Sequence, residues 1–543
     1  MLWKFILLIV CFKHCNAKTG KPNVLFLVID DLRPALGCYD YPKVLSPNID
    51  NLASVSLQFN NAHVQQTVCG PSRTSFLTSR RPDTTRLYDF GSYWRTHAGN
   101  YTTLPQHFKD NGYFTYSIGK VFHPGIPSNF TDDYPLSWST PVFHPPTQKY
   151  KMAKVCPGPD GDLHMNLLCP VDVKTQPGGS LPDIQSAEHA IEMLKNFSKP
   201  SETQPFFLAV GFHKPHIPFK FPKEYLDLYP IEEIDLAPNP EIPPDLPLVA
   251  YSSWPRLLLR EDVKSLNLSF PFGPIPWDFQ RKIRQHYYAS VTYTDAMVGK
   301  VLKQLEASGF ADNTIVTLIG DHGWSLGEHG DWCKYENFEV VTRVPMLVHV
   351  PHVTDKQKSK QQKFQYMDAL ETSQSRTEKD LQTDALVETV DLFPTLSELA
   401  GIEVPPYCPD NPFKVDFCTE GSSFVKLLIH AGKKREITWK DAVFSQYPRP
   451  SDYPQMNTDL PSLKDIKIMG YTMRTNRYRY TEWVGFDPTN FKANFTEVHG
   501  KELYLHNSDP LEIYNVANLK MYADLAESLH KKLLAGWKGA LPT

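Results

Sequence analysis

The stretch that decides the fold is Val24-Leu25-Phe26-Leu27-Val28-Ile29-Asp30-Asp31. Six apolar residues follow one another without the alternation of a half-exposed strand, which predicts a strand buried on both faces of a parallel sheet. The apolar run ends abruptly in two aspartates. Because ligands of open α/β sheets gather at the carboxyl ends of the strands, the same stretch predicts where a functional site lies.

Strand and helix patterns alternate downstream of this stretch. Apolar residues recur at helical spacing in residues 47–55, 187–194 and 279–305, and apolar strands lie at 206–210 and 314–319. This alternation predicts an α/β fold with a large, mostly parallel sheet flanked by helices.

The pattern changes in the last hundred residues. Short β-like segments at 471–474 and 478–481 precede a final helix near 522–534, which predicts a smaller C-terminal α+β domain. We therefore expect a large domain over residues 18–440 and a smaller one over residues 441–543.

A polar stretch over residues 351–384 interrupts the α/β pattern. It could be a basic surface that contacts glycans, but it also carries several acids and is more simply a solvated insertion. Its lysines include Lys356, Lys358, Lys360 and Lys363. A further helix, interrupted by Pro394, is expected over residues 387–400.

The overall composition excludes some classes of protein. The chain has 543 residues, with 56 Lys and Arg against 60 Asp and Glu, so its formal charge is −4. That balance argues against a nucleic-acid binder or an electrostatic membrane binder. The 41% of hydrophobic residues can form a large core, and the length exceeds what one core usually fills.

The first 17 residues read as a secretory signal peptide. Lys4 precedes an apolar run over residues 5–12, and Cys15-Asn16-Ala17 resembles a cleavage site. The run is too short to span a bilayer, which needs roughly 20 apolar residues, and no other segment is long and apolar enough. We therefore expect a secreted or lumenal chain without a transmembrane segment. Five Asn-x-Ser/Thr sites fit that compartment: Asn100, Asn129, Asn196, Asn267 and Asn494.

The cysteine count predicts two disulfides and at least one thiol with another fate. Seven of the nine cysteines remain after signal removal, an odd number. Two local pairs, Cys156 with Cys169 and Cys408 with Cys418, bracket loops and are the expected disulfides. The spacing of the other three matches no zinc pattern, so we expect them to be buried, free or chemically modified. They are Cys38, Cys69 and Cys333.

Polar residues follow three of the expected strands. Asp30-Asp31 ends the first, His213-Lys214-Pro215-His216 follows the second, and Asp321-His322 follows the third. Each group alone could be an ordinary loop. Together they would place three carboxylates, several imidazoles and a lysine along one edge of the sheet, which predicts a functional site there.

The motif Cys69-Gly70-Pro71-Ser72-Arg73 resembles the signature of the sulfatase family, in which the cysteine is oxidised to Cα-formylglycine during secretion. Residues 112–120 resemble the second block of the family, and Asp321-His322-Gly323 resembles its metal-binding block. Sulfate esters react poorly with neutral nucleophiles, whereas the hydrate of an aldehyde offers one hydroxyl to attack and another to expel the product. An expected helix after Cys69 would favour a developing anion there.

Within the family, the chain is similar to members that act on 2-O-sulfated L-iduronate. The resemblance lies in residues 87–99, 120–125, 274–284 and 445–452. It implies a lysosomal sulfatase that hydrolyses the 2-O-sulfate ester of L-iduronate in heparan sulfate and dermatan sulfate, through a formylglycine-hydrate nucleophile and a sulfo-enzyme intermediate. His322, where many sulfatases have Asn, is shared with these members.

The resemblance also implies the parts of the site. One calcium ion is expected on Asp30, Asp31, modified Cys69, Asp321 and His322, although His322 could instead contact the nucleophile or the sulfate. Positive charge on the nucleophile is expected from Arg73 and Lys120, and a base from His123. His213 and Lys334 would bind the bridging oxygen and protonate the leaving sugar. The formylglycine-generating enzyme is an implied partner.

Substrate choice is a separate expectation. The uronate carboxylate needs a cation, for which Arg33 and Lys334 with Tyr335 are expected. Trp324 and Tyr335 could stack on a sugar or belong to the core. The alternatives are a sulfatase for another sulfated sugar or an aryl sulfate, and a catalytically silent glycan-binding homologue. A phosphatase is disfavoured, because such enzymes usually carry Ser or Thr rather than Cys at the nucleophile.

Overall fold

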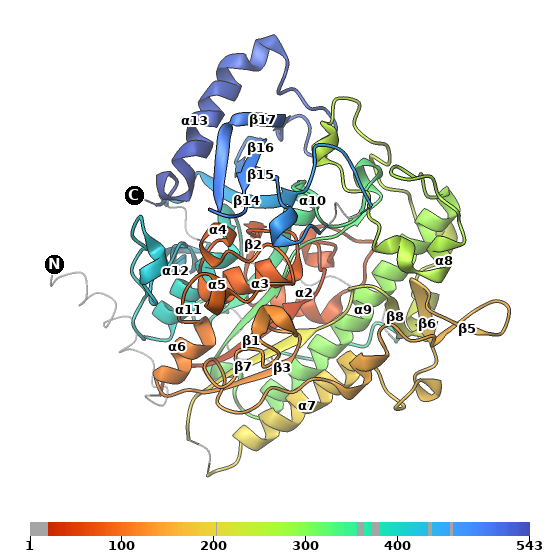
Figure 1. The fold of residues 1–543 in the computed structure, drawn as a ribbon. Helices are drawn as coiled ribbons and strands as arrows, with labels where there is room; N and C mark the ends of the chain where they lie inside the picture. The colour runs from red at the N-terminus through yellow and green to blue at the C-terminus, as the bar shows by residue number, and fades with distance from the viewer. Residues whose placement is uncertain are drawn as a thin grey trace.

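A seven-stranded mixed sheet forms the centre of the molecule (Figure 1). The computed structural model describes residues 20–201, 203–355, 363–371, 381–432, 437–456 and 460–542, so the predicted signal peptide lies outside the described residues. The predicted first strand is β1 (Asn23–Ile29), fully buried. It pairs in parallel with β7 (Phe206–Phe212) and β9 (Thr314–Gly320). The decisive stretch therefore lies inside the sheet, as expected.

The strand order is β13-β2-β12-β9-β1-β7-β3. The other four strands are β2 (Leu57–His63), β3 (Phe114–Gly119), β12 (Arg343–His349) and β13 (Gln382–Glu388). β12 runs antiparallel to both neighbours, and the remaining pairings are parallel. The prediction of a mostly parallel sheet is confirmed.

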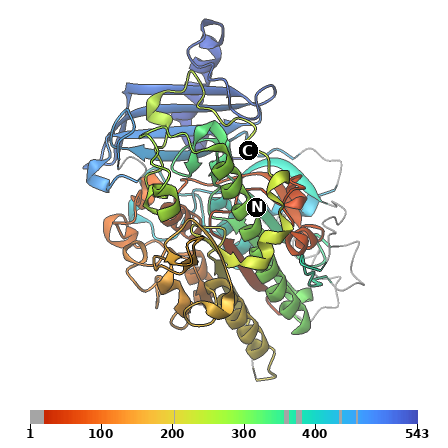
Figure 2. The same ribbon diagram turned by 90° about the vertical axis from the view of Figure 1, so that its right-hand side faces the viewer.

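Helices cover both faces of this sheet (Figure 2). Leu25, Leu27 and Ile29 face one hydrophobic cluster, and Val24 and Phe26 face the other. The first cluster is covered by α2 (Pro47–Ala53), α7 (Pro182–Phe197) and the long α9 (Trp277–Ala307). The second includes residues of α3 (Cys69–Thr78), α6 (Leu104–Asp110), α11 (Leu392–Leu399) and α12 (Val425–His430).

Short helices and pairs of short strands complete the part of the chain that precedes the C-terminal sheet. The helices are α4 (Pro82–Thr85), α5 (Trp94–His97), α8 (Glu261–Lys264) and α10 (Glu339–Thr342). The strand pairs are β4 (Cys156–Pro157) with β5 (Leu163–His164), β6 (Leu168–Val171) with β8 (Phe219–Pro222), and β10 (Ser325–Leu326) with β11 (Trp332–Cys333).

A separate antiparallel sheet follows at the C-terminal end and is drawn in blue in Figure 1. Its strands are β14 (Ala442–Arg449), β15 (Ile468–Thr475), β16 (Tyr478–Asp487) and β17 (Lys492–Leu505), and α13 (Ala523–Gly539) covers it. The expected α+β architecture is confirmed. Tyr447 and Trp483 also join the main core cluster, so the second sheet packs directly against the first part of the chain.

Two expectations were wrong. Val387 and Glu388 belong to β13, which pairs with β2, so the helix expected over residues 387–400 begins only at Leu392. Pro394 does not interrupt α11, because it lies in the first turn, where the missing N–H has no helical partner. Lys363 is not a solvated residue: its buried ammonium pairs with Asp312 and Asp355, each at 2.6 Å. Lys356, Lys358 and Lys360 lie outside the described residues.

The predicted disulfides are confirmed, between Cys156 and Cys169 and between Cys408 and Cys418. The other three cysteines of the described chain are all buried. Four of the five glycosylation sites are exposed, and Asn196 is partly buried. None of the helices in the described ranges is both long and apolar enough to cross a membrane.

Candidate active site

The carboxyl ends of four neighbouring strands converge on one point. Asp30 and Asp31 follow β1, Asp321 follows β9, Lys120 follows β3, and His213 follows β7. Asp31 has a left-handed backbone with φ of 62°, which lets its amide donate to Asp321 Oδ1 at 2.9 Å. The Tyr287 hydroxyl of α9 donates to the Asp31 carbonyl at 2.8 Å and supports this turn. The sheet-edge site predicted from the sequence is thus assembled by the parallel topology.

Cys69 begins α3 and points into this cluster. Its Sγ lies 3.3 Å from Asp30 Oδ1 and 3.3 Å from His322 Nε2, and its residue is 1% exposed. Burial, followed by the Asp30 carboxylate, raises the pKa of the thiol to about 12. A thiolate nucleophile needs a lowered pKa, so the unmodified thiol is poorly suited to attack a substrate.

Arg73, one turn along α3, fixes the nucleophile helix to the carboxylates. Its Nε donates to Asp321 Oδ2 at 2.9 Å and its Nη2 to Asp30 Oδ1 at 3.1 Å. Its Nη1 donates to the Val121 carbonyl at 3.0 Å. The guanidinium is fully buried, and its fork geometry holds two acids and a loop at once.

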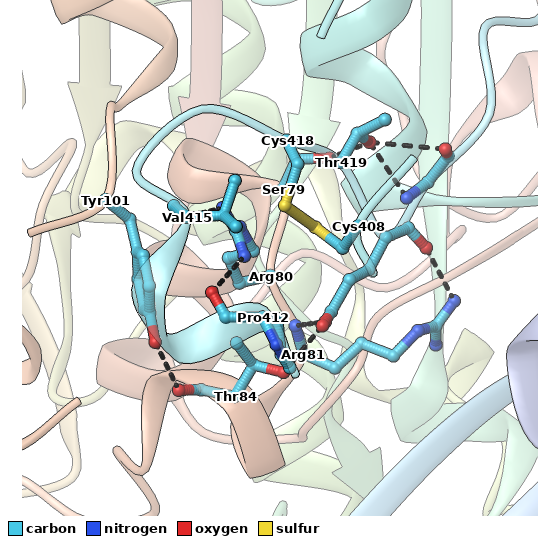
Figure 3. The surroundings of a disulfide bond; sticks show 12 residues. Ser79, Arg80, Arg81, Thr84, Tyr101, Cys408, Pro412, Val415, Cys418 and Thr419 are labelled. Atoms are coloured by element: carbon cyan, nitrogen blue, oxygen red, sulfur yellow. Dashed lines mark hydrogen bonds between the residues drawn. A yellow bond between two sulfur atoms is a disulfide. The ribbon is translucent and has the colours of Figure 1, made fainter. Parts of the chain in front are cut away.

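The other end of α3 is held by the loop that the second disulfide closes (Figure 3). Arg80 Nη2 donates to the Val415 carbonyl at 2.7 Å, and its guanidinium carbon lies 4.5 Å from the centre of the Tyr101 ring. Ser79 Oγ and Thr419 Oγ1 lie 2.7 Å apart. The disulfide between Cys408 and Cys418 therefore stabilises a loop that anchors the helix carrying Cys69.

Two lysines complete the charge balance of the three aspartates. Lys120 Nζ donates to Asp30 Oδ2 at 2.6 Å. Lys334 Nζ donates to Asp31 Oδ1 at 2.7 Å and lies 3.2 Å from Cys69 Sγ. Both predicted lysines are thus buried within reach of position 69 rather than on the surface, and they place positive charge where an anion would develop.

The same residues fit a metal ion. Ligand atoms of Asp30, Cys69, Asp321 and His322 all lie within 4.8 Å of one another. Asp31 Oδ2 is buried and makes no hydrogen bond to any residue that the structure describes, which leaves one carboxylate oxygen available to an ion. Carboxylate oxygens are the ligands that hard divalent cations prefer. His322 Nδ1 bonds the Gly323 carbonyl at 2.9 Å and must carry the proton, so Nε2 offers a lone pair.

Two further histidines lie at the edges of the cluster. His213 Nδ1 bonds Asp183 Oδ1 at 3.1 Å, and the His213 amide also donates to that oxygen, which fixes the ring. The ring of His123 stacks on Phe90, with centroids 4.2 Å apart. Burial and then Lys120 lower the pKa of His123 well below its usual value, which favours the neutral, basic form.

The residues expected to contact the sugar are mostly buried or already have partners within the chain. Arg33 Nη1 pairs with Glu328 at 2.9 Å and donates to the Trp324 carbonyl at 3.2 Å, so its guanidinium has partners within the chain. Trp324 is 2% exposed and Tyr335 6%, and both belong to the main core cluster. Their rings nevertheless lie 5.5 and 5.9 Å from Lys334 Nζ, on the border of the site.

Two residues near the centre, Asp183 and Lys151, were not predicted, and His216 was predicted only as part of the polar group after β7, without a role. Asp183 orients His213, and His216 Nε2 lies 3.9 Å from Asp31 Oδ2. Lys151 lines a cavity with Asp30 and both histidines, and burial together with Lys120 lowers its pKa to about 8. Asp183 and Lys151 carry no motif; only the spacing of the two histidines in His-Lys-Pro-His was a signal.

A carboxyl pair supports the hairpin that presents Lys334. Asp331 and Glu336 flank this lysine, hydrogen-bond each other, and are buried. Burial, followed by the neighbouring Glu336 carboxylate, raises the pKa of Asp331 well above its usual value, and burial raises that of Glu336 to about 7. The folded pair therefore retains a proton that the unfolded chain releases at lower pH.

This pair predicts a contribution to stability that is larger in acid than at neutral pH. Because the pKa of Glu336 is about 7 in the folded protein and near 4.5 in the unfolded chain, its contribution to the free energy of unfolding is fully present below about pH 4.5. That contribution is lost as the pH rises towards about 7. Between about pH 5 and pH 7.5, the wild type should lose about 2 kcal/mol of unfolding free energy relative to Glu336→Gln, which has no carboxyl group to titrate at this position. Denaturant unfolding at both pH values measures this. Glu192→Gln, at an exposed position of α7, is the control; equal pH slopes in wild type and Glu336→Gln would contradict the prediction.

Comparison with known proteins agrees with this geometry. The family model described as Sulfatase matches residues 22–402. Iduronate 2-sulfatase of Homo sapiens is 55% identical over 526 residues, covering 95% of this chain and 94% of the human protein. Iduronate 2-sulfatase of Mus musculus is 54% identical over 539 residues, covering 97% of each chain.

Solved structures share the fold at lower identity. A phosphonate monoester hydrolase from Silicibacter pomeroyi has a TM-score of 0.69 and 19% identity, with 96% of each chain covered. A structure described as a 2-O GAG sulfatase has a TM-score of 0.60 and 21% identity, with 95% of this chain and 92% of that chain covered. The family model spans most of the chain, and the full-length relatives exceed half identity. The chain belongs to the sulfatase family.

Proposed function

We propose that this protein is a lysosomal, calcium-dependent sulfatase that hydrolyses the 2-O-sulfate ester of L-iduronate in heparan sulfate and dermatan sulfate. The observation that carries the substrate is the 55% identity with human iduronate 2-sulfatase over nearly the whole of both chains. The site geometry supports the reaction class, because a buried Cys69 faces cations, carboxylates and imidazoles from separate strands.

Cys69 is proposed to act as formylglycine, made by the formylglycine-generating enzyme during secretion. The modification would supply a hydrated aldehyde, with one hydroxyl to attack sulfur and one to release sulfate. The high pKa of the thiol is consistent with this need, because the unmodified residue would remain protonated. Lys334 and Arg73 would keep positive charge beside position 69.

One calcium ion is the proposed metal. Asp30, Asp31, Asp321, His322 and modified Cys69 would hold it, and the ion would polarise the sulfate group. Lys120 and Arg73 hold the metal-facing carboxylates in place through the ion pairs described above.

Proton transfer is assigned to the histidines at the edges. His123, neutral and partly buried, would remove a proton from the hydroxyl that expels sulfate. His213 presents Nε2, because Nδ1 is held by Asp183. With Lys334 it would bind the bridging oxygen and deliver a proton to the leaving sugar, whose alkoxide leaves poorly without one.

The uronate carboxylate would be met by cations at the border of the site. Lys334 with Tyr335 stays a proposed contact, and Trp324 a proposed sugar platform. Arg33 would first have to exchange its partner Glu328. Lys151, which lines the cavity and has no ion-pair partner in the described part of the chain, adds a further cation to this proposal.

The route to the lysosome rests on the predicted signal peptide over residues 1–17 and on the glycosylation sites. We propose residues 18–440 as the catalytic domain and 441–543 as the smaller domain.

Substrate choice is testable with matched sulfate esters. Protein secreted by a cell able to modify Cys69 should desulfate a disaccharide with terminal 2-O-sulfated iduronate with kcat/KM at least about 100-fold above that for a 6-O-sulfated glucosamine disaccharide or an aryl sulfate. Equal or greater activity on either comparison substrate would overturn the substrate assignment while leaving the family intact.

A further inference from the structure

The backbone around Lys334 is strained. Cys333 and Tyr335, on either side of it, have φ of 82° and 85°. L-residues rarely adopt this left-handed region, and such a backbone persists only where the surrounding contacts fix it. Lys334 Nζ nonetheless donates to Asp31 Oδ1 at 2.7 Å and lies 3.2 Å from Cys69 Sγ. The contacts that fix this backbone therefore decide whether the ammonium group reaches the nucleophile.

Two buried carboxyl groups enclose the strained stretch. Asp331 precedes it and Glu336 follows it, both are fully buried, and their side chains hydrogen-bond each other. Asp331 accepts from the amides of Trp332 at 2.8 Å and Ser252 at 3.1 Å. Glu336 Oε1 accepts from the Ser325 hydroxyl, and Oε2 meets no amide, ammonium or hydroxyl donor among the residues that the structure describes. Because ionised carboxylates only accept, the bond between the two side chains needs a proton on one of them.

These contacts tie the stretch to three neighbouring segments. Ser325 belongs to β10, the partner strand of β11, and Ser252 lies in the segment before α8. The carbonyl of Glu336 accepts from Thr67 Oγ1 at 2.7 Å, and Thr67 lies two residues before Cys69. Glu336 therefore joins the strained stretch to the segment of the nucleophile by its main chain and to the hairpin by its side chain.

The pair also makes the closed form of this stretch depend on pH. Burial raises the pKa of Glu336 to about 7, although hydrogen bonds and nearby cations oppose the shift. The charged and titratable groups that face the pair from its neighbours lie on β14, on β16 and before α8: Arg449, Arg479 and Tyr251. In an opened stretch the Glu336 carboxyl group would meet water and its pKa would return towards 4.5, so opening releases a proton. The closed form is therefore favoured most below about pH 4.5, and less as the pH rises towards about 7.

We propose that Asp331 and Glu336 are positioning residues, whose shared hydrogen bond keeps Lys334 at position 69 and keeps it there more firmly in acid than at neutral pH. The inference rests on the proposed function for what Lys334 does. It deepens that proposal by naming the groups that hold the lysine within reach of the bridging oxygen. Both carboxyl groups act through Lys334 and not on the substrate.

Hydrogen exchange of residues 325–336 tests the pair without any substrate. After correction for the intrinsic exchange rate, the opening constant of these amides in wild type should rise about 50-fold between about pH 5 and pH 7.5, because opening releases the Glu336 proton. In Glu336→Gln, whose amide can donate to Asp331 and has no proton to release, the rise should be less than about 5-fold. Glu192→Gln, at an exposed position of α7, is the control and should behave as wild type.

The kinetic test compares two uncharged replacements of similar size. Glu336→Gln keeps hydrogen-bonding groups towards Asp331 and Ser325, whereas Glu336→Met has none. With a 2-O-sulfated iduronate disaccharide at about pH 5, Glu336→Gln should keep at least about a third of the wild-type kcat, and Glu336→Met should lose about 100-fold. KM should change by less than about 3-fold in both, because Lys334 acts on the bridging oxygen as the ester bond breaks.

The two measurements separate failure of the pair from failure of the substrate assignment. A wild-type opening constant that does not change with pH, or one that changes equally in Glu336→Gln, would overturn the acid dependence. A wild-type kcat in Glu336→Met would overturn the positioning role. If wild type does not desulfate the disaccharide, the substrate assignment fails and hydrogen exchange still decides the pair: at about pH 5 the amides of residues 325–336 should open at least about 10-fold more in Glu336→Met than in wild type.

Discussion

A Cys69→Ser variant is expected to turn over substrate no more than once. A serine hydroxyl at the start of α3 would keep the position of Sγ beside Asp30 and Lys334. It could accept the sulfate, but it offers no second hydroxyl to expel it. Steady-state kcat should therefore fall by at least about 10⁴-fold, with a sulfate ester retained at position 69.

Mass spectrometry of the peptide spanning Cys69 measures both states. In active wild type this peptide should be about 18 Da lighter than the unmodified thiol form, and after substrate the Cys69→Ser peptide should be about 80 Da heavier than before. Cys69→Ala, which has no oxygen, is the control and should gain no mass. Multiple turnovers by Cys69→Ser, or an active wild type with an unmodified thiol, would refute the proposed nucleophile.

The main features of this site were readable from the sequence because they are local. The uninterrupted apolar run of β1 fixes Asp30 and Asp31 at a strand end, and parallel topology brings Asp321 to the same edge. The position of Cys69 at a helix start was likewise readable from adjacent residues. Strand, turn and helix signals of this kind depend on neighbours within about ten residues, so they survive without knowledge of the tertiary structure.

Contacts between residues far apart in the sequence could not be predicted from the sequence. Asp183 orients His213 across 30 positions, and Glu328 occupies Arg33 across 295. Nothing near Arg33 indicates that its charge is already neutralised, which is why it was expected to be available to a carboxylate. The end of β13 was taken for the start of a helix for a similar reason: Val387 and Glu388 pair with β2, a strand more than 300 residues earlier. Long-range pairing decides such segments more strongly than local propensity does.

Removal of the metal should be reproduced by the single change Asp31→Asn. Asparagine has the same shape and can still accept the hydrogen bond from Lys334 through Oδ1, so the fold should persist. With Oδ1 held by Lys334, the amide nitrogen would place hydrogens where Asp31 Oδ2 now makes no hydrogen bond to any described residue, and an amide NH2 group cannot bind a cation. We expect kcat/KM to fall by at least about 10³-fold, as it should when wild type is treated with a calcium chelator.

Metal content and stability distinguish this loss from damage to catalysis alone. At calcium 100-fold above its dissociation constant, wild type should gain about 2.7 kcal/mol in unfolding free energy, because only the folded state assembles the three carboxylates. Asp31→Asn should gain much less and should retain less calcium after gel filtration. Asp278→Asn, where the carboxylate is 94% exposed on α9, should behave as wild type. If Asp31→Asn bound and responded to calcium as wild type does, Asp31 would not be a ligand, and its buried, unpartnered oxygen would have to serve the substrate instead.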